Sequence, residues 1–236
     1  MVILSDPSCI TIEDGAGGEK RILAAKAFKR GDVVLQEKPM LLLPNGTGYH
    51  DIQSLLKCAT EIAGLFGPKG FGITAFRPLS LDVNGNIAKI KEASALHPEA
   101  TSVEALVLAE TKDGTVAPHP KNSATIALLW LRRSIEFAVA FCHGYVDTEK
   151  DLPDIAKESY ASVLKPYHGM MARGLFKVGL MAVPTEASVE HRILKDGLTK
   201  AKVQHDLHSF AQYAEEMVNG LEAFFQEYNL EDTSRA

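Results

Sequence analysis

The sequence predicts an all-α body preceded by a small β segment. From His50 to the end of the chain, apolar residues recur at helical spacing. The longest of these stretches have wide apolar faces, which indicate burial on two sides or burial of something other than protein. Before His50 the apolar residues gather instead into short runs typical of strands. At 236 residues the chain fits one large domain or a domain with an appendage, and we expect a β-hairpin-like appendage at 1–48 and a helical domain at 49–236.

Composition excludes several classes of function. The formal net charge is -5 at pH 7, whereas general nucleic-acid binding needs a basic surface. No stretch of about 18 apolar residues predicts a transmembrane segment, and the N-terminus lacks the features of a signal peptide. The scattered Cys9, Cys58 and Cys142 are typical of reduced thiols rather than of a disulfide framework or a zinc site. We therefore expect a cytosolic protein that uses no metal, no cofactor and no nucleic acid.

Residues 1–48 have the pattern of a β-hairpin. An apolar run at 21–28 is followed by a turn signal at 29–32 and a second run at 33–44. A set of spaced residues here resembles the opening strands of SET-domain methyltransferases: Gly18, Leu23, Ala25, Phe28, Gly31, Val34, Glu37 and Pro39. That family's Asn-His cofactor and catalytic motif has no counterpart downstream, so we expect no methyl transfer. A hairpin unrelated to any family is an equal alternative.

Capping residues and prolines set the helix boundaries in the first half of the helical body. Asp51 can cap a helix that ends before Gly67-Pro68. Pro78 should stop any helix in its vicinity. The Thr-Ser-Val-Glu sequence at 101–104 forms a capping box. The expected elements are a helix at 52–66, a loop at 70–80, a helix at 82–95, a helix from 101 to about 114 and a loop at 115–122.

The second half contains the most apolar predicted helix, at 123–142. A further helix starts at 153–164 and must be interrupted or kinked by Pro166, which has no N–H to donate. Its continuation ends at Pro184. The last helices are expected at 188–196 and 203–228, and the apolar stripe of the last one is Phe210, Tyr213, Met217, Leu221, Phe224, Phe225 and Tyr228.

One predicted helix carries a polar face. Asp82, Asn86 and Lys89 are spaced so that they lie on the same side of it. A carboxylate, an amide and an ammonium within reach of one point supply the donors and acceptors that suit a polyhydroxylated ligand. A solvated helix face is the alternative interpretation, and spacing alone favours it.

Three segments together resemble the glycolipid transfer protein superfamily. They are LDVNGNIAKIKE at 81–92, ATIALLWLRRSIEF at 124–137 and SYASVLKPYHGMMARGLF at 159–176, with Pro184 behind the last. Their order and spacing match that superfamily over about residues 52–228. The resemblance implies a two-layer α-helical sandwich whose layers part to admit ceramide chains, with a surface cleft for the headgroup.

The same resemblance implies a role for each headgroup residue. Asp82 and Asn86 would hydrogen-bond sugar hydroxyls, and Asp82 would also accept from the sphingoid amide N–H. Lys89 would bind a further hydroxyl, Trp130 would stack on the first sugar ring, and His168 would hydrogen-bond the ceramide amide carbonyl. An indole plate suits the apolar face of a sugar, while polar groups suit its hydroxyl rim. Taken singly, each residue has an alternative interpretation: Trp130 is then an aromatic residue of the core. His168 is then a core histidine whose hydrogen bonds are satisfied within the protein.

The resemblance also implies a chain tunnel, and it bears on the choice of headgroup. The residues expected to line the tunnel are Phe137, Phe141, Leu164, Phe176 and Leu180. The branch of the superfamily that carries ceramide-1-phosphate has a basic residue in place of Trp130, whereas Arg133 stands at a position that is basic in both branches. The sequence therefore favours a neutral glycosphingolipid, with a phosphorylated one as the lesser case.

We accordingly expect non-enzymatic transfer of glycosphingolipids between membranes, with transient contact between the protein and the membrane surface. Met170 stands where the superfamily often has a tryptophan that inserts into the membrane interface, which predicts weaker docking. The superfamily's C-terminal tyrosine has no clear match in residues 229–236. The main alternative is a sensor that binds glycolipid or ceramide-1-phosphate with little transfer; a methyltransferase and a helical interaction module are further alternatives.

Overall fold

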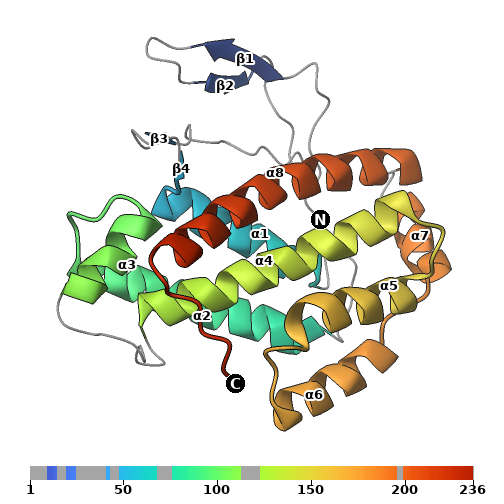
Figure 1. The fold of residues 1–236 in the computed structure, drawn as a ribbon. Helices are drawn as coiled ribbons and strands as arrows, with labels where there is room; N and C mark the ends of the chain where they lie inside the picture. Colours follow the sequence, from blue (N-terminus) through green and yellow to red (C-terminus); the bar gives the residue numbers. More distant parts are fainter. Residues whose placement is uncertain are drawn as a thin grey trace.

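The computed structural model of the protein describes residues 10–14, 20–24, 41–42, 48–67, 76–112, 123–195 and 199–235. Most of the described chain after residue 50 is helical, and the helices pack around the long helix α4 (Ala124–Asp147) (Figure 1). The predicted all-α class is therefore confirmed for the body of the molecule.

Short strands precede the helical body. They are β1 (Ile10–Asp14), β2 (Lys20–Ala24), β3 (Leu41–Leu42) and β4 (Gly48–Tyr49), paired antiparallel as β1 with β2 and β3 with β4. The predicted arm at 21–28 overlaps β2, which pairs with the preceding strand β1, whereas most of the second predicted arm at 33–44 lies outside the described residues. The β1–β2 register places Glu13 opposite Arg21 and Ile12 opposite Ile22 along the two backbones. The predicted turn at 29–32 lies outside the described residues.

The first half of the body contains α1 (Ile52–Leu65), α2 (Arg77–Leu96) and α3 (Val103–Lys112). The predicted cap of α1 is confirmed, since the Ser54 N–H donates to Asp51 Oδ2 over 2.9 Å. The expectation of a loop through residue 80 is wrong, because α2 starts at Arg77 with Pro78 in its first turn. A proline is tolerated there because the N–H that it lacks would have no partner within the helix.

The start of α3 differs from the predicted capping box. Ser102 caps the helix, and its Oγ accepts from the Ala105 N–H over 3.1 Å. Glu104 does not turn back on its own helix. Its buried carboxylate accepts from the backbone N–H of His50 and lies 2.5 Å from His50 Nδ1. The acid therefore ties α3 to the segment that enters α1.

The second half contains α4, α5 (Leu152–Ser159), the π-helical turn η3 (Tyr160–Leu164), α6 (Met170–Met181), α7 (Glu186–Lys195) and α8 (Lys200–Glu227). Ser123 caps α4 by accepting from the Ile126 N–H. The predicted interruption at Pro166 is confirmed. The Lys165 N–H donates to the Tyr160 carbonyl, five residues back, over 2.9 Å, and the chain then turns before α6.

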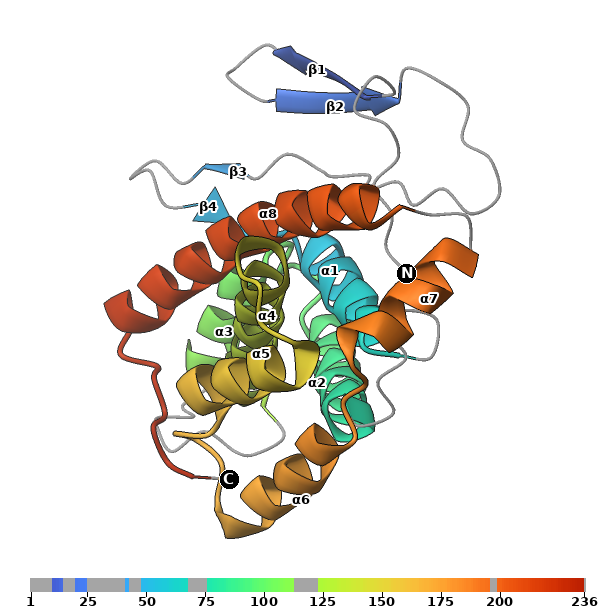
Figure 2. The ribbon, with the colours of Figure 1, turned by 90° about the vertical axis from the view of Figure 1, so that its right-hand side faces the viewer.

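Helix α4 forms the centre of the core. It packs against α2, α5, η3 and α8, and it runs between α8 and α2 in Figure 1. Figure 2 shows α6 at the edge of the body, beyond α5. Among the described residues, Cys58 and Cys142 are free thiols within the core, and burial raises the pKa of Cys142 to about 12. None of the described helices is long and apolar enough to cross a membrane.

We predict that Gly144→Ala destabilises the fold, because an added Cβ would meet Cγ2 of the buried Ile155 at 2.5 Å. Overpacking of this kind typically costs about 1–3 kcal/mol, which outweighs the better helix propensity of alanine. Gly85→Ala is the matched control, because its added Cβ has nothing within 4 Å and should stabilise the protein. Thermal melting followed by circular dichroism compares the two, and an equal rise in Tm for both would contradict the prediction.

Candidate functional site

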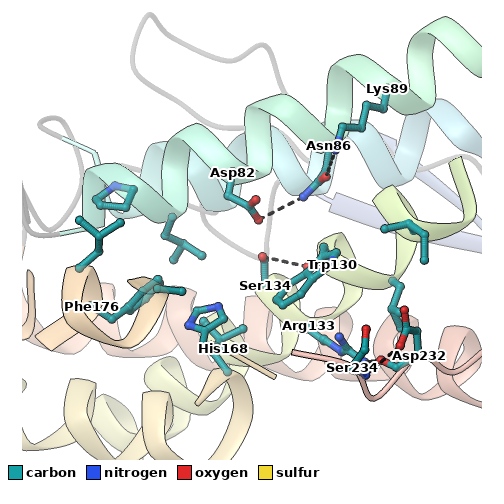
Figure 3. Close-up of a pocket in the computed structure, with 17 residues that line it drawn as sticks. Asp82, Asn86, Lys89, Trp130, Arg133, Ser134, His168, Phe176, Asp232 and Ser234 are labelled. Atoms are coloured by element: carbon teal, nitrogen blue, oxygen red, sulfur yellow. Dashed lines mark hydrogen bonds between the residues drawn. The ribbon is translucent and has the colours of Figure 1, made fainter. Parts of the chain in front are cut away.

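A cavity of about 530 Å³ opens between α2, α4, α6 and the C-terminal segment. In Figure 3 most of the labelled polar side chains, among them Lys89, Arg133 and Asp232, lie toward one end of this cavity, and Phe176 lies toward the other with His168 beside it. The lining residues are Pro78, Leu79, Asp82, Asn86, Lys89, Ile126, Leu129, Trp130, Arg133, Ser134, Leu164, His168, Ala172, Leu175, Phe176, Asp232 and Ser234. The five residues expected to bind a headgroup all belong to this set, so the structure brings them together.

The α2 wall carries a short chain of hydrogen bonds. Lys89 Nζ donates to Asn86 Oδ1 over 3.4 Å, and Asn86 Nδ2 donates to Asp82 Oδ2 over 3.1 Å (Figure 3). Asn86 is buried, which fixes its amide between the two charged groups, while Asp82 is open to the cavity. The helical spacing that predicted a shared face is therefore matched by direct contacts.

Asp82 has a perturbed acidity. Protein atoms crowd its carboxyl group although the group opens into the cavity, and this desolvation raises its pKa above the ordinary value. Lys89 and the Asn86 hydrogen bond act in the opposite direction. A carboxylate that is only partly stabilised by its neighbours retains capacity to accept hydrogen bonds from a ligand.

The opposite wall is a stack of rings. The ring centroids of Trp130 and His168 lie 5.7 Å apart at an interplanar angle of 23°. The ring centroids of His168 and Phe176 lie 4.8 Å apart. Phe176 stacks in turn on Tyr160, whose hydroxyl lies 3.2 Å from His168 Nδ1. Because Trp130 comes from α4 and Phe176 from α6, the stack joins two elements across the cavity.

His168 is a neutral base at physiological pH. Burial, followed by the positive charges of Arg173 and Arg133, lowers its pKa from 6.5 to about 4. The neutral ring has one N–H and one acceptor nitrogen, so it can take the Tyr160 hydrogen bond at Nδ1 and keep its Nε2–H for a ligand.

The expected chain-tunnel residues separate into two groups. Leu164 and Phe176 line the cavity. Phe137 and Phe141 are fully buried and pack edge-on or tilted against Phe66 and Phe76, with ring centroids 5.4 to 6.3 Å apart across the four contacts. Leu180 is also buried outside the lining. In this structure these three residues belong to the core rather than to the cavity wall.

The contribution of the C-terminal segment to the cavity was not predicted from the sequence. Asp232 and Ser234 line the cavity, and the Asp232 carbonyl accepts a hydrogen bond from Arg133. The segment lacks the expected tyrosine and so carried no recognisable motif. The available signal was charge, because consecutive acids at 231 and 232 can neutralise the consecutive arginines at 132 and 133.

The fold agrees with the comparisons with known proteins. The family model for glycolipid transfer protein (GLTP) matches residues 50–194, and the chain belongs to this family. Pleckstrin homology domain-containing family A member 8 from Danio rerio is 33% identical over 168 residues, which is 68% of this chain and 30% of that protein. Glycolipid transfer protein A from Xenopus laevis is 28% identical over 185 residues, 76% of this chain and 87% of that protein.

Solved structures share the fold. The structure described as showing how FAPP2 selects simple glycosphingolipids using the GLTP fold aligns with a TM-score of 0.67 and 25% identity, covering 84% of this chain and 94% of that one. The chain spans 30% of the length of the Danio rerio relative. The family match begins at residue 50, and the comparisons do not support the resemblance of residues 1–48 to SET strands.

We predict that lowering the pH from 7 toward 4 destabilises the protein in part through His168. The unfolded histidine titrates near 6.5 and the folded one near 4, so the unfolded state binds more protons in this range and stability falls with pH. The loss should be on the order of 2 kcal/mol after allowance for solvent screening. Urea unfolding of the wild type and His168→Phe isolates this part, because the carboxylates titrate in both proteins. An identical pH dependence in the two would contradict the prediction.

Proposed function

We propose that this chain carries a glycosphingolipid between membranes without chemical change. The observation that carries the proposal is the cavity in which the donors and acceptors of α2 face the Trp130 ring, with apolar side chains at the other end. The proposal assigns the sugar to Asp82, Asn86, Lys89 and Trp130. It also assigns the lipid-binding domain to residues 49–236 and leaves 1–48 as an appendage.

The need for an enclosed path follows from the hydrophobic effect. A ceramide with about 30 chain carbons costs roughly 24 kcal/mol to expose to water, at about 0.8 kcal/mol per CH₂. A hydrocarbon-like interior removes most of that barrier, but the bilayer offers the same environment. Chain burial is therefore nearly neutral between membrane and protein, and selection depends on the headgroup.

The headgroup end supplies directional contacts. Asp82 and Asn86 offer acceptors and donors for hydroxyl groups, and hydrogen bonds to charged groups contribute about 1.5–3 kcal/mol each. Trp130 offers a flat apolar surface for a sugar ring. His168, with Tyr160 at Nδ1, can donate from Nε2 to the amide carbonyl of a ceramide. Because no bond is made or broken, transfer requires no catalytic base.

The chain also presents a surface suited to a bilayer. Five exposed apolar side chains lie on α6: Met170, Met171, Leu175, Val178 and Met181. Lys165 and Lys177 are exposed beside them and can attract anionic headgroups. Leu175 is 57% exposed and also lines the cavity, so this helix joins the cavity to the outer surface. We propose that α6 contacts the cytosolic face of a membrane transiently while lipid enters or leaves.

The direct test is transfer of fluorescent galactosylceramide between vesicles. We predict that Asp82→Val abolishes binding and transfer while the protein stays folded, because the central acceptor of the polar wall is lost. Glu92→Val, an exposed site on the same helix outside the cavity lining, is the control and should transfer normally. Normal transfer by Asp82→Val would refute the headgroup assignment. Binding by the wild type without transfer would favour the sensor.

We predict that Met170→Trp increases vesicle association and transfer, and that Met170→Glu with Met171→Glu decreases both by about tenfold. An indole is favoured at the membrane interface, whereas carboxylates there are costly. Leu96→Glu is the control, because Leu96 is 74% exposed on α2 rather than on α6. Vesicle co-sedimentation measures the association, and an equal loss in the control would mean that α6 is not the docking surface.

A further inference from the structure

Two adjacent arginines of α4, of which Arg133 lines the polar end of the cavity, are held by the C-terminal segment. The Arg132 guanidinium forms an ion pair with the Glu231 carboxylate. The Arg133 Nη2 donates to the Asp232 carbonyl over 2.6 Å and lies 3.6 Å from the Glu231 carboxylate. Both arginines are buried, at 4% and 1% exposure, so these contacts replace most of their hydration.

Arg133 forms part of the cavity wall. Its guanidinium lies 3.5 Å from the centroid of the Tyr167 ring and 5.1 Å from that of Trp130. Within the described part of the chain, Nε of Arg132 and Nε of Arg133 have no hydrogen-bond partner. Arg133 thus has an unused donor beside the place proposed for the headgroup.

The arginines at this end of the cavity already have acids beside them. Glu231 pairs with both guanidinium groups, the charges of Asp232 and Glu136 act on Arg133, and on α2 the carboxylate of Asp82 lies near Lys89. A neutral headgroup can enter without breaking an ion pair. An anionic headgroup would meet these carboxylates, and it would have to displace Glu231 from the arginines before it could be paired.

We propose that the acidic C-terminal segment at 231–232 is a selectivity filter that occupies the arginine pair and excludes sphingolipids with anionic headgroups. This inference rests on the proposed function and deepens it, since it names the class of headgroup that the site rejects. In this proposal, anionic headgroups are rejected by the carboxylates of Glu231 and Asp232, which come from a distant part of the chain. These carboxylates add to the preference for neutral headgroups that Trp130 gives.

The test is Glu231→Gln combined with Asp232→Asn, which removes both charges and keeps the backbone carbonyl bonded to Arg133. The protein has a single tryptophan, which lies in the cavity, so its fluorescence reports binding independently of transfer. We expect the wild type to bind galactosylceramide at least about tenfold more tightly than ceramide-1-phosphate, as one charge-assisted contact allows. In the variant this ratio should fall by about tenfold through a gain for ceramide-1-phosphate, with galactosylceramide within about twofold of wild type.

Glu216→Gln with Glu227→Gln is the matched control, because these exposed acids of α8 change the net charge equally outside the cavity lining. The control should keep the wild-type ratio, and melting curves establish that each variant is folded. Glu231→Gln alone should give an intermediate ratio and serves if the double variant is unstable. An unchanged ratio in both Glu231 variants, or a wild type that binds the two lipids equally, would overturn the filter. Binding without vesicle transfer would contradict the proposed shuttle and leave the filter supported.

Discussion

The buried positive charge of Arg133 needs neighbouring groups to replace its lost hydration, and this requirement constrains the polar end of the cavity. Removing an ion from water costs several kcal/mol unless partners replace its hydration. Here the partners are the Tyr167 ring, the Asp232 carbonyl and the Glu231 carboxylate, which come from the turn after η3 and from the segment after α8. Satisfying one charge on the central helix therefore brings two distant segments to the cavity and holds Trp130 beside the guanidinium.

The proposed function depends on separating the two ends of the ligand. The apolar side chains of Leu164, Leu175 and Phe176 offer a hydrocarbon chain an environment similar to that of a bilayer. The free energy of the chain therefore differs little between the protein and the membrane. The polar end discriminates because its hydrogen-bond geometry is fixed by internal contacts, from Lys89 to Asn86 to Asp82. The aromatic cluster of Phe66, Phe76, Phe137 and Phe141 fills the core beside α4. In the proposed mechanism, longer chains need this packing to open, which is consistent with the expectation that the helical layers part.

Local sequence signals predicted the elements more reliably than the contacts between them. Asp51 caps its helix as expected, and Ser123 caps α4 in the same way, since a cap depends on residues within one turn. Where a sequence-based assignment was wrong, the residue either binds a partner elsewhere in the fold or occupies a position at which its type is tolerated. Glu104 binds His50 rather than its own helix, and Pro78 sits in the one turn of a helix where proline does no harm.

The sequence by itself determined the helical class, the family and the shared face of Asp82, Asn86 and Lys89, because periodicity and capping are local properties of the chain. The resemblance to the family also indicated Trp130 and His168 as headgroup residues, and both line the cavity. Only the tertiary structure decided that His168 is neutral, since its burial and the nearby Arg133 and Arg173 arise from packing. It alone decided that Phe137 and Phe141 fill the core, and that acids about a hundred residues from the arginines along the chain close the polar end. These features depend on the electrostatic and steric environment of each group, which exists only once separate segments are packed together.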